Sequence, residues 1–401
     1  MYNQDQIVRK YEIEKNKLRL GCEYKENLTE EILHELEKVS IFESNDNFDY
    51  PIDNLPNSIK TIIMGNKFNQ NVDNLPFELN FLLLKFYFDK SVDLLPSSLK
   101  TLIIRSTFNG KVDNLPHCLT HLELDGYFNN SLDNLPITLE YLKLGDRFNQ
   151  TIDHLPPNLK TLYLGDEFNQ KLDNLPQGLI KLFIGKNFNQ SVDNLPDSLE
   201  GLFFGLSFCR PILKYPNSLK FLILSYYYNH PISNVPDSLE LLYLGRHFTK
   251  ELKLKDSNLK VLIFDDQSLY NRRLDELPLS LNTLIINSEI PDLYTLPETL
   301  DTLIIGFKFN DSLSLLPKQL RTLVLGYYPN YKLNCLEPCP MYFFNKIICY
   351  PENLKNLVIN PRYAHYKKLK RPISLNVYSK EKVGLCLTGL EKYRYLLRDV
   401  L

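Results

Sequence analysis

A stretch rich in histidine and cysteine is the first place where the sequence could bind a metal ion. His117, Cys118 and His121 stand close together, and Glu123 follows, so the ligand types of zinc are gathered in one short segment. A structural zinc site needs four ligands, and no second ligand pair stands nearby. Twenty residues earlier, the slots of His117, Cys118 and His121 hold Ser97, Ser98 and Thr101. We therefore interpret these residues as structural and predict no zinc site.

Three cysteines toward the end of the chain form a second group. Cys335, Cys339 and Cys349 supply at most three thiolates, with His365 nearby, and we favour the interpretation without a metal. The seven cysteines of the chain are scattered and odd in number, which is typical of reduced thiols in a cytosol-like compartment. The sequence therefore predicts a cytoplasmic protein.

A column of aspartates recurs at a spacing of twenty residues, and it could bind calcium. Its members are Asp53, Asp73, Asp93, Asp113, Asp133, Asp153, Asp173 and Asp193. Carboxylates about 5 Å apart in water repel by only ~0.8 kcal/mol, so the column is tolerable if each side chain caps its own Asp-Asn-Leu-Pro turn. The alternative is calcium bridging neighbouring coils. We favour turn capping, because the repeat lacks a glycine-rich calcium loop, and we predict no metal and no cofactor.

Motifs for catalysis are missing from the sequence. It contains no phosphate-binding loop, nucleophile elbow, metal-binding His-Glu helix or dinucleotide fingerprint. Columns of identical Asp and Asn follow from repetition rather than from a convergent active site. We predict that the protein is not an enzyme.

The repeat itself determines how these residues are positioned. Phenylalanine recurs every twenty residues from Phe48 to Phe208, Tyr228 and Phe248 continue that column, and proline keeps the same spacing from Pro56 to Pro236. Each unit opens L-x-x-L-x-L with β-branched and aromatic residues between the leucines, which is typical of a strand. Twenty residues cannot close a core alone, so successive units must stack.

Stacked units predict a β-rich solenoid of about 15 coils whose strands form one long parallel sheet. Proline lacks an N–H and must lie on the opposite, turn-rich side. We expect an asparagine column to form a hydrogen-bonding ladder that satisfies backbone groups in the turns. The strand units begin at Ile59, Leu79, Leu99, Leu119, Leu139, Leu159, Leu179, Leu199, Leu219, Leu239, Leu259, Leu281, Leu300, Leu320 and Leu354.

The consensus L-P-x-x-L-x-x-L-x-L-G-x-x-F-N-Q-x-[IVL] resembles the FNIP repeat, a relative of leucine-rich repeats found in slime-mould proteins and amoebal giant viruses. The resemblance covers roughly residues 48 to 330. Most units depart from F-N-x-P-I, and only Tyr50-Pro51-Ile52, Arg210-Pro211-Ile212 and His230-Pro231-Ile232 keep the Pro-Ile pair. The resemblance implies a right-handed, leucine-rich-repeat-like coil that binds other proteins without catalysis. A viral origin would imply host cytoplasm and a host partner.

The ends of the chain differ from the repeat and divide it into three parts. Residues 1–47 are predicted to form an N-terminal helical cap, residues 48–360 the solenoid, and residues 361–401 a basic segment with a capping helix. The N-terminal helix is expected over Asn27 to Lys38, with Asn27 as its N-cap. A truncated F-box is the alternative, and through the family it would imply a substrate adaptor of a ubiquitin ligase.

The basic C-terminal segment, PRYAHYKKLKRP, is interpreted as a solvated linker rather than as a site for an anionic partner. The formal net charge of -2 gives no global field for nucleic acid. The first residues do not form a secretory signal, and no apolar run approaches the ~20 residues of a membrane helix. We therefore expect neither nucleic acid nor membrane as a partner.

The outward strand positions, which do not repeat, are where we expect function. Positions 2, 3 and 5 of each unit point away from the core, and Glu123 and Lys143 divide the apolar side chains of position 5 into two groups. Large exposed apolar patches mark interaction sites, so we expect a protein partner there. The alternative is a structural protein that forms a homo-oligomer through the same face. The predicted partner-binding residues are Tyr163, Phe183, Phe203, Phe221, Ile223, Leu241, Tyr243, Val261 and Ile263.

Overall fold

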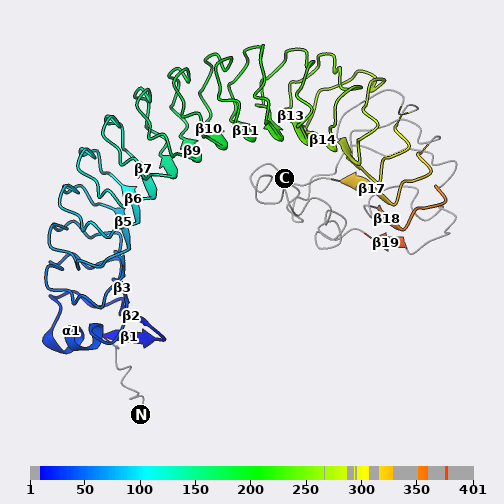
Figure 1. Cartoon of the computed structure of the whole chain (residues 1–401). Coiled ribbons are helices and arrows are strands. Elements are labelled where there is room, and N and C mark those ends of the chain that lie inside the picture. Colours follow the sequence, from blue (N-terminus) through cyan, green and yellow to red (C-terminus); the bar gives the residue numbers. More distant parts are fainter. Residues whose placement is uncertain are drawn as a thin grey trace. The chain divides into compact units, whose positions relative to one another are not determined.

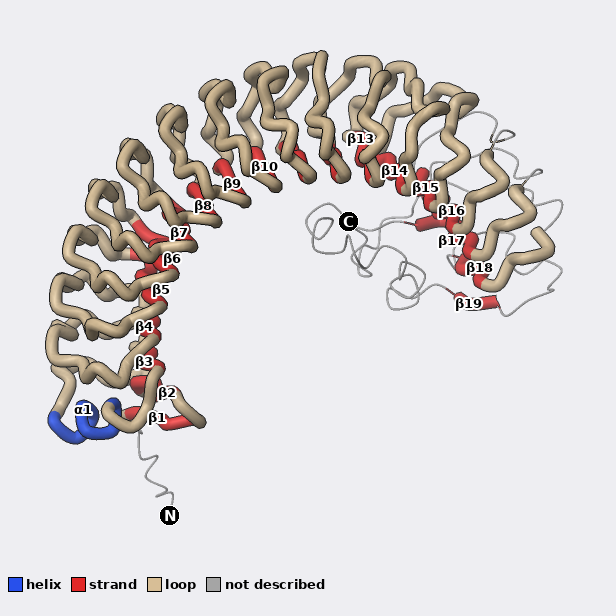
Figure 2. Tube along the Cα trace, viewed as in Figure 1, coloured by secondary structure: helices blue, strands red, loops and turns tan. Residues whose placement is uncertain are grey.

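The computed structural model describes residues 10–265, 267–286, 293, 296–306, 316–327, 351–359 and 375–377. The chain divides into two compact units, Met1–Leu206 and Ser207–Leu401. Both units consist of strands joined by turns, and helix is found only in α1 among the described residues (Figures 1 and 2). The predicted C-terminal cap, the basic segment, and Cys335, Cys339, Cys349 and His365 lie outside the described residues.

The first unit contains a hairpin, one helix and a run of parallel strands. Its elements are β1 (Tyr11–Glu14), β2 (Lys17–Leu20), α1 (Glu30–Leu36), β3 (Ile41–Glu43), β4 (Thr61–Ile63), β5 (Phe81–Phe86), β6 (Thr101–Ser106), β7 (His121–Gly126), β8 (Tyr141–Leu144), β9 (Thr161–Leu164), β10 (Lys181–Ile184) and β11 (Gly201–Phe204). β1 pairs antiparallel with β2. From β2 onward each strand pairs in parallel with the next.

In the described residues of the second unit, all strands are parallel. They are β12 (Phe221–Ile223), β13 (Leu241–Leu244), β14 (Val261–Phe264), β15 (Thr283–Ile286), β16 (Thr302–Gly306), β17 (Thr322–Tyr327), β18 (Asn356–Ile359) and β19 (Leu375–Val377). Each pairs in parallel with the next. Both units thus have the predicted leucine-rich-repeat-like coil.

The repeat pattern specifies the core in the way the sequence predicts. In one representative coil the leucines at positions 1, 4 and 6 and the phenylalanine at position 10 are buried: Leu159, Leu162, Leu164 and Phe168. The phenylalanine rings stack from coil to coil, with 6.1 Å between the centroids of Phe128 and Phe148 and 6.2 Å between those of Phe148 and Phe168. Parallel strands lie only ~4.8 Å apart. The coils of the first unit are therefore closer together at the sheet than at the phenylalanine column.

The predicted asparagine ladder is confirmed. The backbone N–H of Asn149 donates to Oδ1 of Asn129 at 2.9 Å, and that of Asn169 donates to Asn149 at 2.9 Å. Gln170, the residue after Asn169, adds a side-chain hydrogen bond: its Nε2 donates to the carbonyl oxygen of Asn149 at 3.0 Å. The ladder satisfies turn N–H groups that the sheet cannot reach.

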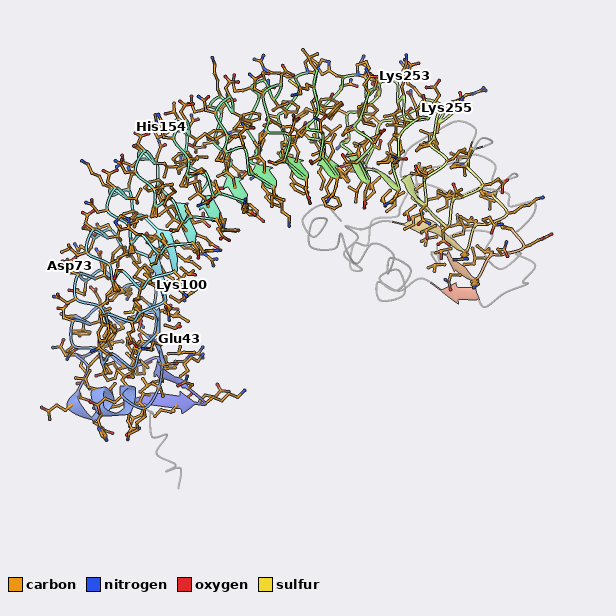
Figure 3. All side chains as sticks on the ribbon, in the orientation of Figure 1. Glu43, Asp73, Lys100, His154, Lys253 and Lys255 are labelled. Atoms are coloured by element: carbon orange, nitrogen blue, oxygen red, sulfur yellow. The ribbon has the colours of Figure 1, made fainter. Side chains whose placement is uncertain are left out.

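The aspartate column forms hydrogen bonds between coils in addition to bonds within a turn. Oδ2 of Asp93, Asp133 and Asp193 accepts from the serine hydroxyl two residues earlier in the same turn. Oδ1 of Asp153 accepts from Nδ2 of Asn174 in the next coil at 2.9 Å, and Asp173 accepts from Asn194 at 2.9 Å. In these two turns the carboxylate therefore accepts a hydrogen bond from the next coil. Figure 3 shows Asp73 on the turn side of the first unit, away from the strands.

A glycine after the strand allows neighbouring coils to approach closely. A Cβ atom added to Gly165 would lie 2.0 Å from the carbonyl oxygen of Gly145 and 2.3 Å from its carbonyl carbon. Real Cβ atoms essentially never come within 3.0 Å of a backbone atom. The recurrent glycine of the repeat is therefore a steric requirement of coil packing rather than only a turn signal.

The N-terminal cap differs from its prediction. The helix runs over Glu30–Leu36, and its N-cap is Thr29, because the Thr29 side chain accepts from the N–H of Ile32 at 3.4 Å; the prediction of Asn27 is wrong. The hairpin β1–β2 and the strand β3 were not predicted. β3 begins a coil in which Phe42 and Ser44 replace the usual leucines, so the L-x-x-L-x-L pattern does not reveal it.

Candidate protein-interaction face

Five rings line the outward face of the sheet in the first unit, one on each strand from β7 to β11. This ring ladder consists of His121, Tyr141, Tyr163, Phe183 and Phe203. The distances between successive centroids are 4.0, 5.5, 4.0 and 4.3 Å. The second pair, between Tyr141 and Tyr163, is tilted by 44°, and the rings of the other three pairs are parallel to within 7°.

The register of the strands produces this stack. Tyr163, Phe183 and Phe203 are direct partners in the parallel ladder, so their side chains leave the sheet at the same height. The ring spacing of 4.0–4.3 Å is shorter than the ~4.8 Å between strands. The rings therefore cover one another's faces, and their edges are the surface left to a partner.

A glycine makes room for the last ring of the ladder. A Cβ atom on Gly201 would lie 2.7 Å from Cε2 of Phe203, so the ring leans over the bare backbone two residues earlier. Phe203 is only 6% exposed as a result of its packing, whereas Tyr163 and Phe183 remain partly exposed. Of the three residues predicted here, two therefore offer surface.

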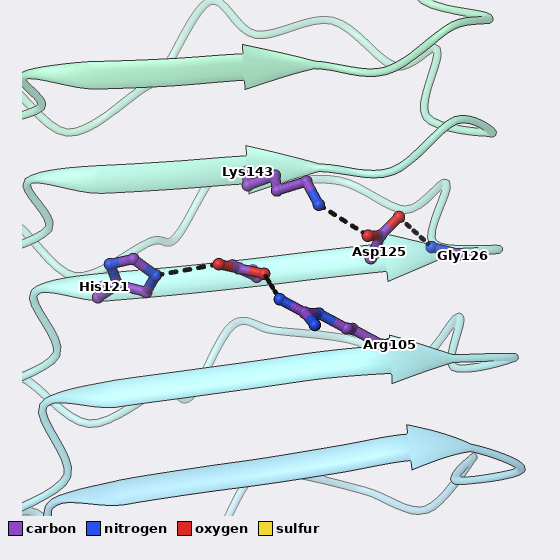
Figure 4. Close-up of polar contacts among 6 residues, drawn as sticks. Arg105, His121, Asp125, Gly126 and Lys143 are labelled. Atoms are coloured by element: carbon purple, nitrogen blue, oxygen red, sulfur yellow. Dashed lines mark hydrogen bonds and ion pairs between the residues drawn. The ribbon is translucent and has the colours of Figure 1, made fainter. Parts of the chain in front are cut away.

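A charged cluster adjoins the ladder on β6, β7 and β8: Arg105, His121, Glu123, Asp125 and Lys143 (Figure 4). Glu123 Oε2 accepts from Arg105 at 3.0 Å, and His121 Nε2 lies 3.3 Å from Glu123 Oε1. Because an ionised carboxylate only accepts, that histidine nitrogen carries the proton. Lys143 donates to Asp125 at 2.8 Å. Glu123 is thus paired within the cluster although its side chain is only 10% exposed.

These contacts shift the acidity of Glu123. Its pKa falls from 4.5 to about 2, chiefly through the hydrogen bond with His121; burial opposes the shift, and Arg105 adds to it. Burial raises the pKa of the neighbouring Tyr141, so its hydroxyl stays protonated. The cluster therefore keeps Glu123 ionised beside the ring ladder.

The lowered pKa of Glu123 predicts a loss of stability in acid. Because the folded-state pKa lies below the unfolded one, ionised Glu123 stabilises the folded chain above pH ~4.5, and this contribution disappears as the pH falls toward ~2. Between these pH values we expect wild type to lose up to about 3 kcal/mol more than an Arg105→Gln/Glu123→Gln variant. Urea unfolding at several pH values measures the difference, and parallel pH profiles would contradict the assignment.

The predicted residues of the second unit are placed differently. Phe221 is partly exposed, but Ile223, Leu241, Tyr243, Val261 and Ile263 are buried, with exposed fractions of 5, 1, 7, 4 and 0%. We expected exposed side chains there, and for these five that expectation is wrong. Tyr243 also donates its hydroxyl to Asp265 Oδ2 at 2.8 Å. These residues present no free surface.

The burial of these five side chains agrees with the burial of the strands that carry them in the second unit. β13 reads LLYL, β14 reads VLIF and β15 reads TLII, and all residues of these strands are buried. Parallel strands that are buried on both faces have continuous apolar runs instead of alternation. In the first unit β8 reads YLKL and β10 reads KLFI, with buried and partly exposed positions alternating. A continuous apolar run alone is not a sequence signal for this burial, because β5 in the first unit reads FLLLKF and still alternates between buried and partly exposed positions.

The other candidate residues do not form a metal site in the described part of the chain. His117 and Cys118 are exposed in a turn, apart from His121 on the sheet face. Within the described ranges, no three or more His, Cys, Asp or Glu side chains come together in a way that could hold a metal ion. The helix found there is too short to cross a bilayer.

Comparisons with known proteins agree with the coil geometry. The FNIP Repeat family matches residues 108–147, 128–167, 148–186, 168–207 and 210–247. CroV588, a giant-virus protein described as a novel circular LRR protein, has a solved structure that is 29% identical, with a TM-score of 0.72. The match covers 92% of this chain, which spans only 60% of CroV588.

A weaker likeness extends to a bacterial protein, and no curated protein matches the sequence. YopM from Yersinia enterocolitica WA-314 is 18% identical with a TM-score of 0.36, over 80% of this chain and 87% of YopM. The family match and the CroV588 likeness both fall on the coils described above. The coils of this chain are therefore leucine-rich-repeat-like, and residues 108–207 and 210–247 match the FNIP Repeat family.

Proposed function

We propose that this protein is a non-catalytic scaffold that binds a protein partner through the outward face of β7 to β11. The observation that carries the proposal is the ring ladder, where Tyr163 and Phe183 are stacked at 4.0 Å and partly exposed. Stacked rings are already ordered, so a partner that packs on them loses little additional side-chain entropy. Aromatic residues are also enriched among those that dominate binding energy.

The geometry restricts the proposed face to the first unit. On the sheet side of the first unit, the outward rings of successive coils lie close together. The opposite side carries polar turns such as the one with Asp73 (Figure 3). Leucine-rich-repeat-like folds generally bind proteins, which supports this choice of function. The likeness to a giant-virus protein makes a host-cell protein the partner to test first.

Replacing both exposed rings is expected to abolish partner capture. A Tyr163→Ser/Phe183→Ser variant keeps the leucine core, so it should fold, but it removes the apolar contact surface. The control is Ile137→Ser, which changes a 64% exposed apolar residue in a turn of the same unit. Affinity capture from amoebal lysate, quantified for each variant, compares them. Equal recovery of the partner by the ring variant and wild type would refute the face.

Self-association through this face is the competing outcome. A second copy would bury the same rings, and then sedimentation velocity would show a dimer of wild type that the ring variant lacks. A wild-type monomer at micromolar concentration would remove self-association and leave the separate partner.

A further inference from the structure

We propose that the charged cluster beside the ring ladder receives a carboxylate side chain from the partner, so that the face recognises an acidic, extended segment. This inference rests on the proposed function and adds the chemistry of the partner. Its basis is the unequal exposure of the charges on β6, β7 and β8.

The Arg105 cation of the cluster is more exposed to solvent than the Glu123 anion with which it pairs. The Arg105 side chain is 53% exposed, while its partner Glu123 is 10% exposed. The guanidinium uses Nη2 for Glu123, and its five N–H groups leave donors that point to solvent. Lys85, partly exposed on β5, is the register partner of Arg105 and adds a second cation. An approaching segment therefore meets positive charge before it meets Glu123.

The remaining charges nearby do not reverse this sign. Lys143 is 32% exposed and pairs with Asp125, which is 30% exposed. Beyond the end of β9, Asp166 pairs with Lys186 and Glu167 with Arg147. Lys85, Arg105 and Lys143 thus outnumber Glu123 and Asp125, before any charge on His121. A partner carboxylate can bond bidentately to Arg105 without displacing Glu123.

The ring ladder favours the same kind of segment. Stacked rings present their edges outward, and the edge of an aromatic ring carries the positive end of its quadrupole. Carbonyl and carboxylate oxygens are therefore better neighbours for this face than ammonium groups. Apolar side chains of the partner can pack between those oxygens on Tyr163 and Phe183.

The strand spacing sets the arrangement within the partner. From β6, which carries Arg105, to β9, which carries Tyr163, there are three steps of ~4.8 Å, or ~14 Å across the strands. Arg105 also lies two residues, or ~6.6 Å, further along the strand direction than the register row of Tyr163, so the two backbone positions are ~16 Å apart. An extended chain covers that distance in about five residues at ~3.3 Å each, so we expect an acidic residue about five positions from the first apolar one, in a segment that crosses the strands.

Selection from a random peptide library displayed on phage tests the inference on the full chain. Peptides retained by wild type should be enriched in Asp or Glu at about that spacing from Leu, Ile or Phe. A selected peptide, synthesised with a fluorescent label, should bind the Arg105→Gln/Glu123→Gln variant about tenfold more weakly, as expected for a charge-assisted contact. This variant keeps the net charge and leaves no unpaired carboxylate at position 123.

The matched control is Arg147→Gln/Glu167→Gln, which removes an exposed ion pair of 2.8 Å outside the ladder and should leave the affinity unchanged. Peptides without acidic enrichment, or equal affinity for both double variants, would overturn the carboxylate site. If peptides that contradict the carboxylate site nevertheless bind the Tyr163→Ser/Phe183→Ser variant more weakly than wild type, the proposed function is still supported. Peptides indifferent to the ring variant, or no selected peptide at all, would overturn both proposals.

Discussion

A Gly165→Ala variant is expected to lose about 3 kcal/mol of stability or to fail to fold. The added methyl group would stand 2.0 Å from the carbonyl oxygen of Gly145 and 2.7 Å from Cα of Asp146. Both contacts are with backbone, so no side-chain rotation can relieve them. The two coils would have to separate and weaken the parallel pairing of β8 and β9.

Gly178→Ala is the matched control, because its added Cβ would meet the flexible end of Lys160 at 3.1 Å and one carbonyl at 3.7 Å. Thermal and urea unfolding followed by circular dichroism should show little change for Gly178→Ala and a large loss for Gly165→Ala. Equal midpoints for the two variants would mean that the coils are not packed as described.

Replacing one phenylalanine of the column by alanine is expected to lower the free energy of unfolding by about 3–5 kcal/mol. Phe148 is fully buried between Phe128 and Phe168, so Phe148→Ala leaves a cavity that the two neighbouring coils share. Because each coil contacts only its neighbours, the loss should be largest for the coils on either side of position 148.

Phe77→Ala removes the same atoms from a side chain that is 63% exposed, and its effect on stability should stay within about 0.5 kcal/mol. Urea midpoints, with hydrogen exchange of the neighbouring strands, measure both variants. A Phe148→Ala chain as stable as Phe77→Ala would show that the column does not form the core.

The coil could be predicted from the sequence because one local pattern is repeated. Each buried slot, such as those of Leu159 and Phe168, recurs at the same spacing, so the parallel register and the asparagine ladder follow from stacking alone. The steric role of the glycine at position 165 could not be predicted in the same way, because it depends on the distance between coils. The cap at Thr29 depends on a single hydrogen bond that competing polar residues could also have made.

The exposure of the outward side chains differs between the two units. Tyr163 and Phe183 lie partly exposed on the face, whereas Ile263 on the equivalent face of the second unit is fully buried. Repetition reveals which residues point outward, but it does not reveal whether that side is covered.

The charged cluster could be predicted only in part. Glu123 and Lys143 are register partners, as their spacing implies, yet Glu123 bonds to Arg105 and His121 instead. Arg105 was not predicted as part of the outward face. The strand β6 is six residues long, so position 7 of this unit, which is Arg105, also lies on that face. The length of a strand beyond its consensus depends on pairing with the next coil rather than on the repeat.

Photo-crosslinking tests the position of the binding face most directly. A benzophenone analogue of phenylalanine is placed at position 183 in one chain and at position 137 in another, and each is irradiated with the captured partner. We expect crosslinks to the partner from position 183 and none from position 137. Crosslinks from position 137 alone, or equally from both positions, would contradict the ring ladder as the site of binding.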